Sequence, residues 1–109
     1  MIVEVSGLAR ADLDEIFDYY ENRQPGLGQR FIDELHQVAA RIVQFPRGWA
    51  AVSRRSRRCQ FHDFPYAAYY QINGDAAVIF AIWHLHRRDE WRKRERLDVP
   101  RFRLPPSSP

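Results

Sequence analysis

The sequence predicts an α+β fold: an N-terminal strand, an antiparallel helical hairpin packed on a mainly antiparallel sheet of about four to five strands, and a short C-terminal helix. Three observations lead to this prediction. Apolar residues recur at helical spacing up to residue 45, the period changes towards two from Trp49 onward, and 109 residues suffice for one core without disulfide staples. We expect residues 1–98 to form a single domain and residues 99–109 to form a flexible tail rich in Pro and Ser.

The N-terminal part predicts a strand and two helices. The β-branched run from Ile2 to Val5, followed by Ser6-Gly7, indicates a first strand. A helix over roughly residues 8–23 would carry one apolar stripe, formed by Leu13, Ile16, Phe17 and Tyr20. A second helix is expected from near Pro25, a favourable first-turn residue, to about Gln44. Its apolar face is formed by Leu27, Phe31, Leu35, Val38, Ile42 and Phe45.

Strand periodicity dominates the rest of the domain. Apolar and polar residues alternate around Cys59 and again around Tyr70, as in half-buried strands. The pair Asn73-Gly74 favours a tight hairpin turn. It leads into the run from Ala76 to Trp83, which is apolar at every position and is therefore expected in the middle of the sheet with both faces covered. A short helix is expected over roughly residues 89–96.

Composition indicates a cytoplasmic protein. The single Cys59 cannot form an internal disulfide, and no apolar run approaches the roughly 20 residues that span a bilayer. The N-terminus lacks the charged and apolar regions of a signal peptide. We expect no membrane contact and no cofactor. No metal site is expected either, because a third clustered ligand is missing beside His84 and His86.

Charge is divided unevenly along the chain. Residues 1–46 carry eight acidic and four basic side chains, a net of −4, whereas residues 47–109 carry six acidic and thirteen basic ones, a net of +7. The run Arg54-Arg55-Ser56-Arg57-Arg58 has three interpretations. It contacts a protein partner or target, it contacts RNA phosphates, or it is a solvated edge strand that charge protects against aggregation.

A cluster of cationic and aromatic residues follows the apolar strand. It comprises His84, His86, Arg87, Arg88 and Trp91. Such side chains must be solvated or paired when a buried strand ends in them. The sequence therefore predicts a binding site at this end of the sheet.

The chain as a whole resembles the RelE/ParE superfamily of toxins from bacterial toxin–antitoxin pairs. The resemblance covers residues 3 to about 96 and rests on elements in family order: Ala11-Asp12-Leu13-Asp14-Glu15-Ile16, Tyr19-Tyr20, Pro46, Arg57 or Arg58, Phe64-Pro65-Tyr66 and Tyr70. The closing pattern resembles the ParE-like, plasmid-stabilisation branch: His84, Arg87-Arg88, Trp91 and Arg94. The resemblance implies a hetero-oligomer with a cognate antitoxin, which docks in an apolar groove beside the helical hairpin. It also implies a target, either DNA gyrase or ribosome-bound mRNA.

The favoured hypothesis is a ParE-like toxin that inhibits growth by binding DNA gyrase, without catalysis of its own. The residues expected to contact the target are Arg87, Arg88 and Trp91, with Arg57, Arg58 and Arg94 in second rank.

Two other functions remain open at this point. A RelE-like, ribosome-dependent mRNA endonuclease would use Arg87 to hold the scissile phosphate and His84 or His86 to move protons. Trp91 stands where such ribonucleases often have a tyrosine, and its indole cannot exchange protons in that role, although it can stack on a base. The third hypothesis is a non-toxic module that only binds its antitoxin.

Overall fold

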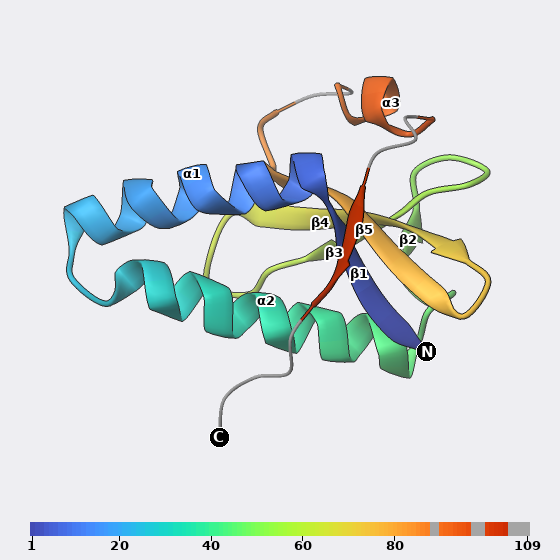
Figure 1. Cartoon of the computed structure of the whole chain (residues 1–109), viewed down its shortest axis with the longest axis horizontal. Coiled ribbons are helices and arrows are strands. Elements are labelled where there is room, and N and C mark those ends of the chain that lie inside the picture. The colour runs from blue at the N-terminus through green and yellow to red at the C-terminus, as the bar shows by residue number, and fades with distance from the viewer. Residues whose placement is uncertain (88–89, 97–99, 105–109) are drawn as a thin grey trace.

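Two antiparallel helices cover one face of a six-stranded sheet in the computed structural model, which describes residues 1–87, 90–96 and 100–104 (Figure 1). In chain order the elements are β1 (Ile2–Ser6), α1 (Gly7–Arg23), α2 (Leu27–Gln44), β2 (Ala50–Ala51), β3 (Arg57–Gln60), β4 (Tyr66–Asn73), β5 (Ala76–His84), α3 (Trp91–Arg94) and β6 (Arg101–Arg103). The strands lie in the order β2-β3-β4-β5-β1-β6. Only β1 and β5 run parallel, so the predicted fold class is confirmed.

The sheet has six strands, whereas periodicity predicted about four to five. The strands that were missed are β2 and β6, which have two and three residues. Arg101–Arg103 pair with β1, and the N–H of Gly7 donates to the carbonyl of Pro100 over 2.8 Å. The prediction of a flexible tail is therefore wrong for these residues. Without β6 the backbone groups on the edge of β1 opposite β5 would be unpaired, and this pairing outweighs the polar composition of the segment.

The helical hairpin follows the predicted stripes except at Phe45, which was expected on the apolar face of α2 but follows the end of that helix and is 56% exposed. Ser6 caps α1, because its hydroxyl accepts from the N–H of Ala9 over 3.1 Å. The helix α2 begins at Leu27 rather than near Pro25, since Gly26 adopts a φ of 89° just before it. The first N–H groups of α2 are satisfied from α1: the Glu21 carboxylate accepts from Gly26 and Gly28 over 2.9 and 3.0 Å.

The central hairpin joins β4 and β5 one residue later than predicted. Asn73 pairs with Ala76, so Gly74 and Asp75 form the loop, and Gly74 has a φ of 61°. The prediction for β5 itself is confirmed, since all its residues from Ala76 to Trp83 are buried. On one face of the sheet β5 packs with both helices in the main core. The fully buried residues of this core include four from α2: Phe31, Leu35, Val38 and Ile42.

The other face of the sheet is covered by α3. Trp91 stacks on Tyr69 with 5.7 Å between ring centroids, and both belong to a second apolar cluster with Phe80 and Trp83. The described helix spans Trp91–Arg94, within the predicted range of 89–96. Residues 88–89, 97–99 and 105–109 lie outside the described residues, and they include residues 99 and 105–109 of the expected tail.

None of the helices in the described part of the chain is long and apolar enough to cross a membrane.

Candidate target-contact site

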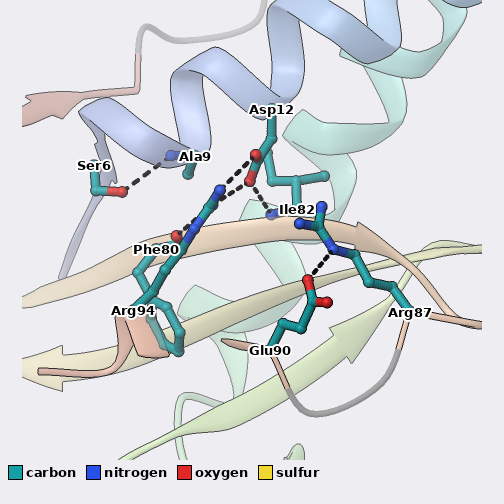
Figure 2. Close-up of polar contacts among 8 residues, drawn as sticks. All are labelled: Ser6, Ala9, Asp12, Phe80, Ile82, Arg87, Glu90 and Arg94. Carbon is teal, nitrogen blue, oxygen red and sulfur yellow. Dashed lines mark hydrogen bonds and ion pairs between the residues drawn. The ribbon is translucent and has the colours of Figure 1, made fainter. Parts of the chain in front are cut away.

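A carboxylate on the first helix binds an arginine on the last. Arg94 donates through Nη1 to Asp12 Oδ2 over 2.6 Å and through Nη2 to Asp12 Oδ1 over 3.1 Å (Figure 2). The same arginine reaches the carbonyl of Phe80 over 3.3 Å, and Asp12 also accepts from the N–H of Ile82 over 3.1 Å. These two side chains are only 17% and 9% exposed. They join α1, β5 and α3 in one network.

The network forms beside an irregularity in the sheet. Between Tyr69 and Tyr70 the register of β4 against β5 shifts, since Tyr69 pairs with Ala81 but Tyr70 pairs with Ile79. Phe80 therefore has no direct partner on β4, and a bulge of this kind changes which face the following side chains occupy. Arg94 and Asp12 bind backbone groups on either side of Ala81, so the bulge gives α3 its attachment point.

Two of the residues expected to contact the target thus have structural partners. Trp91 is 4% exposed and is stacked on Tyr69, which leaves its ring no free face for a base or a partner. Arg94 is held by Asp12. Both side chains fasten α3 to the sheet. Arg88 lies outside the described residues.

Arg87 is the exposed arginine at the end of β5. Its Nε lies 3.0 Å from Glu90 Oε2, and both side chains are about half exposed, at 46% and 54% (Figure 2). Its guanidinium carbon lies 3.8 Å from the centre of the Trp83 ring. A cation over an indole gains attraction from the ring quadrupole. Arg87 is therefore oriented by Trp83 and Glu90, while part of its guanidinium remains accessible to a partner.

The two histidines lie on the opposite side of β5. Their rings stack with 5.0 Å between centroids, and His84 Nδ1 accepts from the N–H of His86 over 3.1 Å. The neutral His84 ring therefore carries its proton on Nε2. His84 also meets the edge of Tyr66, which packs on the helix side of the sheet, whereas Trp83 beneath Arg87 belongs to the cluster on the other face. The structure does not bring the histidines and Arg87 together.

Arg57 and Arg58 lie further along the sheet. Arg57 pairs with Tyr70 and Arg58 with Tyr69, whereas His84 pairs with Tyr66. Arg58 is thus about 10 Å along the strand direction from the end where Arg87 follows, at about 3.3 Å per residue. Arg57 donates to the carbonyl of Trp49 over 2.8 Å, and Arg58 Nε is buried with no hydrogen-bond partner among the described residues. These two arginines form no common site with Arg87.

Two tyrosines of β4 pair with candidate site residues, Tyr70 with Arg57 and Tyr66 with His84. Burial raises the pKa of Tyr70 to about 12, although the charge of Arg57 lowers it in part. The hydroxyl of Tyr70 donates to the carbonyl of Pro46 over 2.7 Å. Burial likewise raises the pKa of Tyr66 to about 12. A phenol of this kind holds its proton at neutral pH and is a poor general base.

A second arginine cluster was found only in part by sequence analysis. Two cavities of about 280 and 650 Å³ share the loop residues Ser53, Arg54 and Arg55. The run from Arg54 to Arg58 signalled the loop. Its neighbours across the cavities were missed, because they come from distant segments: Arg47 before β2, and Arg92 and Arg96 around α3.

In the part of the chain that the structure describes, no three His, Cys, Asp or Glu side chains gather as metal ligands. Cys59 is buried, and burial raises the pKa of its thiol. It is therefore a core residue, since a reactive cysteine needs an exposed thiolate.

Comparison with known proteins gives a consistent result. The family model for the ParE toxin of the type II toxin–antitoxin system parDE matches residues 3–91. One similar solved structure is the chromosomal ParDE toxin–antitoxin system from P. aeruginosa, with a TM-score of 0.67 and 20% sequence identity over 77% of this chain and 95% of that one. At this identity the likeness supports the fold alone. No curated protein sequence matches the chain significantly. The family match spans most of the chain, which therefore belongs to the ParE toxin family of type II toxin–antitoxin systems.

Proposed function

We propose that this toxin inhibits growth by binding DNA gyrase, that it does so without catalysing a reaction, and that a cognate antitoxin neutralises it in the cytoplasm. The observation that carries the proposal is the separation of Arg87 from the histidines. Arg87 rests on Trp83 on one face of the sheet, while His84 and His86 stack on the other face, beside Tyr66.

The endonuclease alternative needs these groups at one phosphate. Cleavage of RNA by acid–base chemistry requires the proton-transferring group within about 3 Å of the 2′-oxygen or the leaving oxygen, while a cation holds the same phosphate. Arg87 lies over Trp83 and the histidines stack beside Tyr66, an arrangement that does not favour a shared phosphate. An arginine that binds a protein target has no such constraint, so the arrangement favours a contact role for Arg87.

Exposed apolar side chains on the helical hairpin support the antitoxin part of the proposal. Tyr19 on α1 is 49% exposed, and Val43 and Phe45 at the end of α2 are 40% and 56% exposed. These side chains leave apolar surface at both ends of the hairpin, and an amphipathic segment that runs along the hairpin would cover it. The sequence analysis expected the antitoxin beside this hairpin, and we retain that expectation as part of the proposal.

The test is a supercoiling assay with purified gyrase and relaxed plasmid DNA. The wild-type chain should block supercoiling and trap cleaved DNA. The double substitution Arg87→Ala and Arg88→Ala should abolish both effects, whereas His84→Ala with His86→Ala should leave both intact. Circular dichroism confirms that each variant folds. Unimpaired supercoiling with folded wild-type protein at a large excess over gyrase would overturn the proposal.

A further inference from the structure

The loop between β2 and β3 presents arginines to two cavities at once. The smaller cavity is lined by Arg47, Arg54, Arg55 and Arg57 together with Ser53, Ser56, Tyr70, Gln71 and Ile72. The larger one is lined by Ser53, Arg54, Arg55, Arg92, Glu95 and Arg96. Because Arg54 and Arg55 border both, the cavities form one continuous surface. We call it the arginine surface, and its members are Arg47, Arg54, Arg55, Arg57, Arg92 and Arg96.

The charge of this surface is not neutralised within the molecule. Within residues 1–87, 90–96 and 100–104 the ion pairs are Arg87–Glu90, Arg94–Asp12 and Arg101–Glu4, and none of them uses the arginine surface. Among the described lining residues the one acidic residue is Glu95, which lines the larger cavity and whose carboxylate accepts a hydrogen bond from the hydroxyl of Ser53 over 2.7 Å. The surface thus carries six guanidinium groups and one carboxylate, which is an unfavourable arrangement unless an anion binds.

The loop is ordered by its own hydrogen bonds. The Ser53 hydroxyl accepts from the N–H groups of Arg55 and Ser56 over 3.2 and 3.1 Å. On the sheet side, Gln71 Nε2 donates to Ser56 Oγ over 3.2 Å and to the carbonyl of Glu95 over 2.7 Å. These bonds connect the loop to β4 and to the end of α3. The exposed arginines at its tip are therefore presented by a fixed backbone, which lowers the entropy lost when an anion binds.

The residues that line the arginine surface favour one kind of partner among a protein, a single-stranded nucleic acid and a duplex. The core of a protein–protein interface is enriched in aromatic residues and Met as well as Arg, whereas nucleic-acid interfaces are polar and strongly positive throughout. Single-stranded nucleic acid is held by stacking on exposed rings. Tyr70 is the one aromatic residue among the described lining residues, and it is fully buried. A surface of guanidinium and hydroxyl groups without an accessible ring fits the regular phosphates of a duplex.

We propose that the arginine surface binds the phosphate backbone of double-stranded DNA, independently of sequence. The inference deepens the proposed function and rests on it for its biological meaning, because gyrase acts on duplex DNA and a toxin that also contacts that DNA is held at its target. The binding itself needs no gyrase. It uses a different part of the molecule from Arg87, whose partners are Trp83 and Glu90.

The test measures binding of the full chain to a fluorescent duplex by anisotropy, across a series of salt concentrations. Each phosphate contact adds about 0.9 to the slope of log K against log salt, so about four contacts predict a slope near −3.6. The substitution of Arg54 and Arg55 by alanine should weaken binding at least about tenfold and reduce the slope by about two. Replacement of both by lysine should keep most of the affinity, because non-specific phosphate contacts need the charge.

The matched control removes two positive charges elsewhere. Arg10 and Arg30 are exposed on α1 and α2, and their replacement by alanine should change the affinity for the duplex by less than about threefold. Equal losses from the two double-alanine variants would overturn the inference, since the effect would then be one of net charge. Tighter binding to the single strand of the same sequence would overturn it as well. A third result would also overturn it: the Arg54 and Arg55 alanine variant binds the duplex normally but no longer binds the antitoxin. The surface would then be a protein-binding site.

The outcomes for gyrase and for DNA are separable. If the wild-type chain inhibits gyrase but does not bind duplex DNA at about 150 mM salt, this inference fails and the proposed function stands. If it binds the duplex through Arg54 and Arg55 but leaves supercoiling unimpaired, the proposed function fails and the DNA-binding surface stands.

Discussion

Asp12 and Arg94, which are 82 residues apart in the sequence, form a bidentate pair with N–O distances of 2.6 and 3.1 Å. Asp12 also accepts a hydrogen bond from the N–H of Ile82, so its carboxylate binds both β5 and the helix α3. The pair explains how a helix of four residues stays attached to the sheet. It also places the arginines of α3 beside the β2–β3 loop.

Replacement of Asp12 by alanine should destabilise the fold strongly. It leaves the Arg94 charge and the N–H of Ile82 without their acceptor in a largely buried site, and loss of one partner of such a pair costs about 3 kcal/mol. The measurement is the free energy of unfolding in urea. Asp14→Ala is the matched control, because Asp14 is exposed on the same helix and its loss should cost less than about 0.5 kcal/mol. Equal effects of the two substitutions would contradict the network.

Glu34 should stabilise the segment before β4. Its buried carboxylate accepts from the N–H of Asp63 over 2.8 Å and from the N–H of His62 over 3.1 Å. Charge-assisted bonds of this kind contribute about 1.5–3 kcal/mol, so Glu34→Ala should lose about that much stability. Glu34→Gln retains one acceptor oxygen and should lose less. Amide hydrogen exchange at His62 and Asp63 measures the effect locally, and unchanged protection in Glu34→Ala would refute it.

Alkaline pH should destabilise the protein through its buried phenols. The pKa of Tyr70 is about 12 in the folded state against a normal value of 10.0, so the unfolded chain loses this proton first as pH rises. The associated stability is complete below about pH 10 and is lost between about pH 10 and 12, an effect on the order of 2 kcal/mol. Urea unfolding at several pH values in this range should show the loss, and Tyr70→Phe should show a smaller one. A wild-type protein as stable above pH 11 as at pH 8 would argue against the burial of these hydroxyls.

Gly28 marks the closest approach of the two helices. A Cβ at this position would lie 2.7 Å from the Phe17 ring and 2.9 Å from the Phe17 carbonyl oxygen. Gly28→Ala should therefore cost about 1–3 kcal/mol by overpacking, although alanine is the better helix former by about 1 kcal/mol. Thermal unfolding measures the change, with Gln29→Ala as the exposed control. A stabilised Gly28→Ala variant would mean that the helices are not in close contact here.

Periodic segments were the part of the fold that could be predicted from sequence. The stripes of α1 and α2 and the wholly apolar β5 each repeat a local pattern, so their faces were assigned correctly apart from Phe45, which follows the end of α2 and is 56% exposed. The strand β6 has only three residues and is defined by backbone bonds to β1, which no side-chain pattern records. The helix α2 begins after Pro25 because Gly26 is its N-cap residue, with a positive φ and an N–H group bound by the Glu21 carboxylate.

The candidate site was harder to predict, because charge patterns do not reveal partners. Trp91 and Arg94 were grouped with the target-contacting residues, yet one is stacked on Tyr69 and the other is paired with Asp12. Arg92 and Arg96 reach the β2–β3 loop only because those two contacts fix α3 in place. For Arg57, Arg58, Arg87 and Arg88, contact with the target stays a prediction.

The central claim is that this toxin acts on gyrase and cleaves no RNA. It is tested most directly by mapping new RNA 5′ ends across the transcriptome shortly after the chain is induced in bacteria that lack its antitoxin, with DNA-damage transcripts measured in the same sample. We expect no new cleavage sites and a strong DNA-damage response. Cuts phased with the codons of translated messages would contradict it and would return His84 and His86 to a catalytic role.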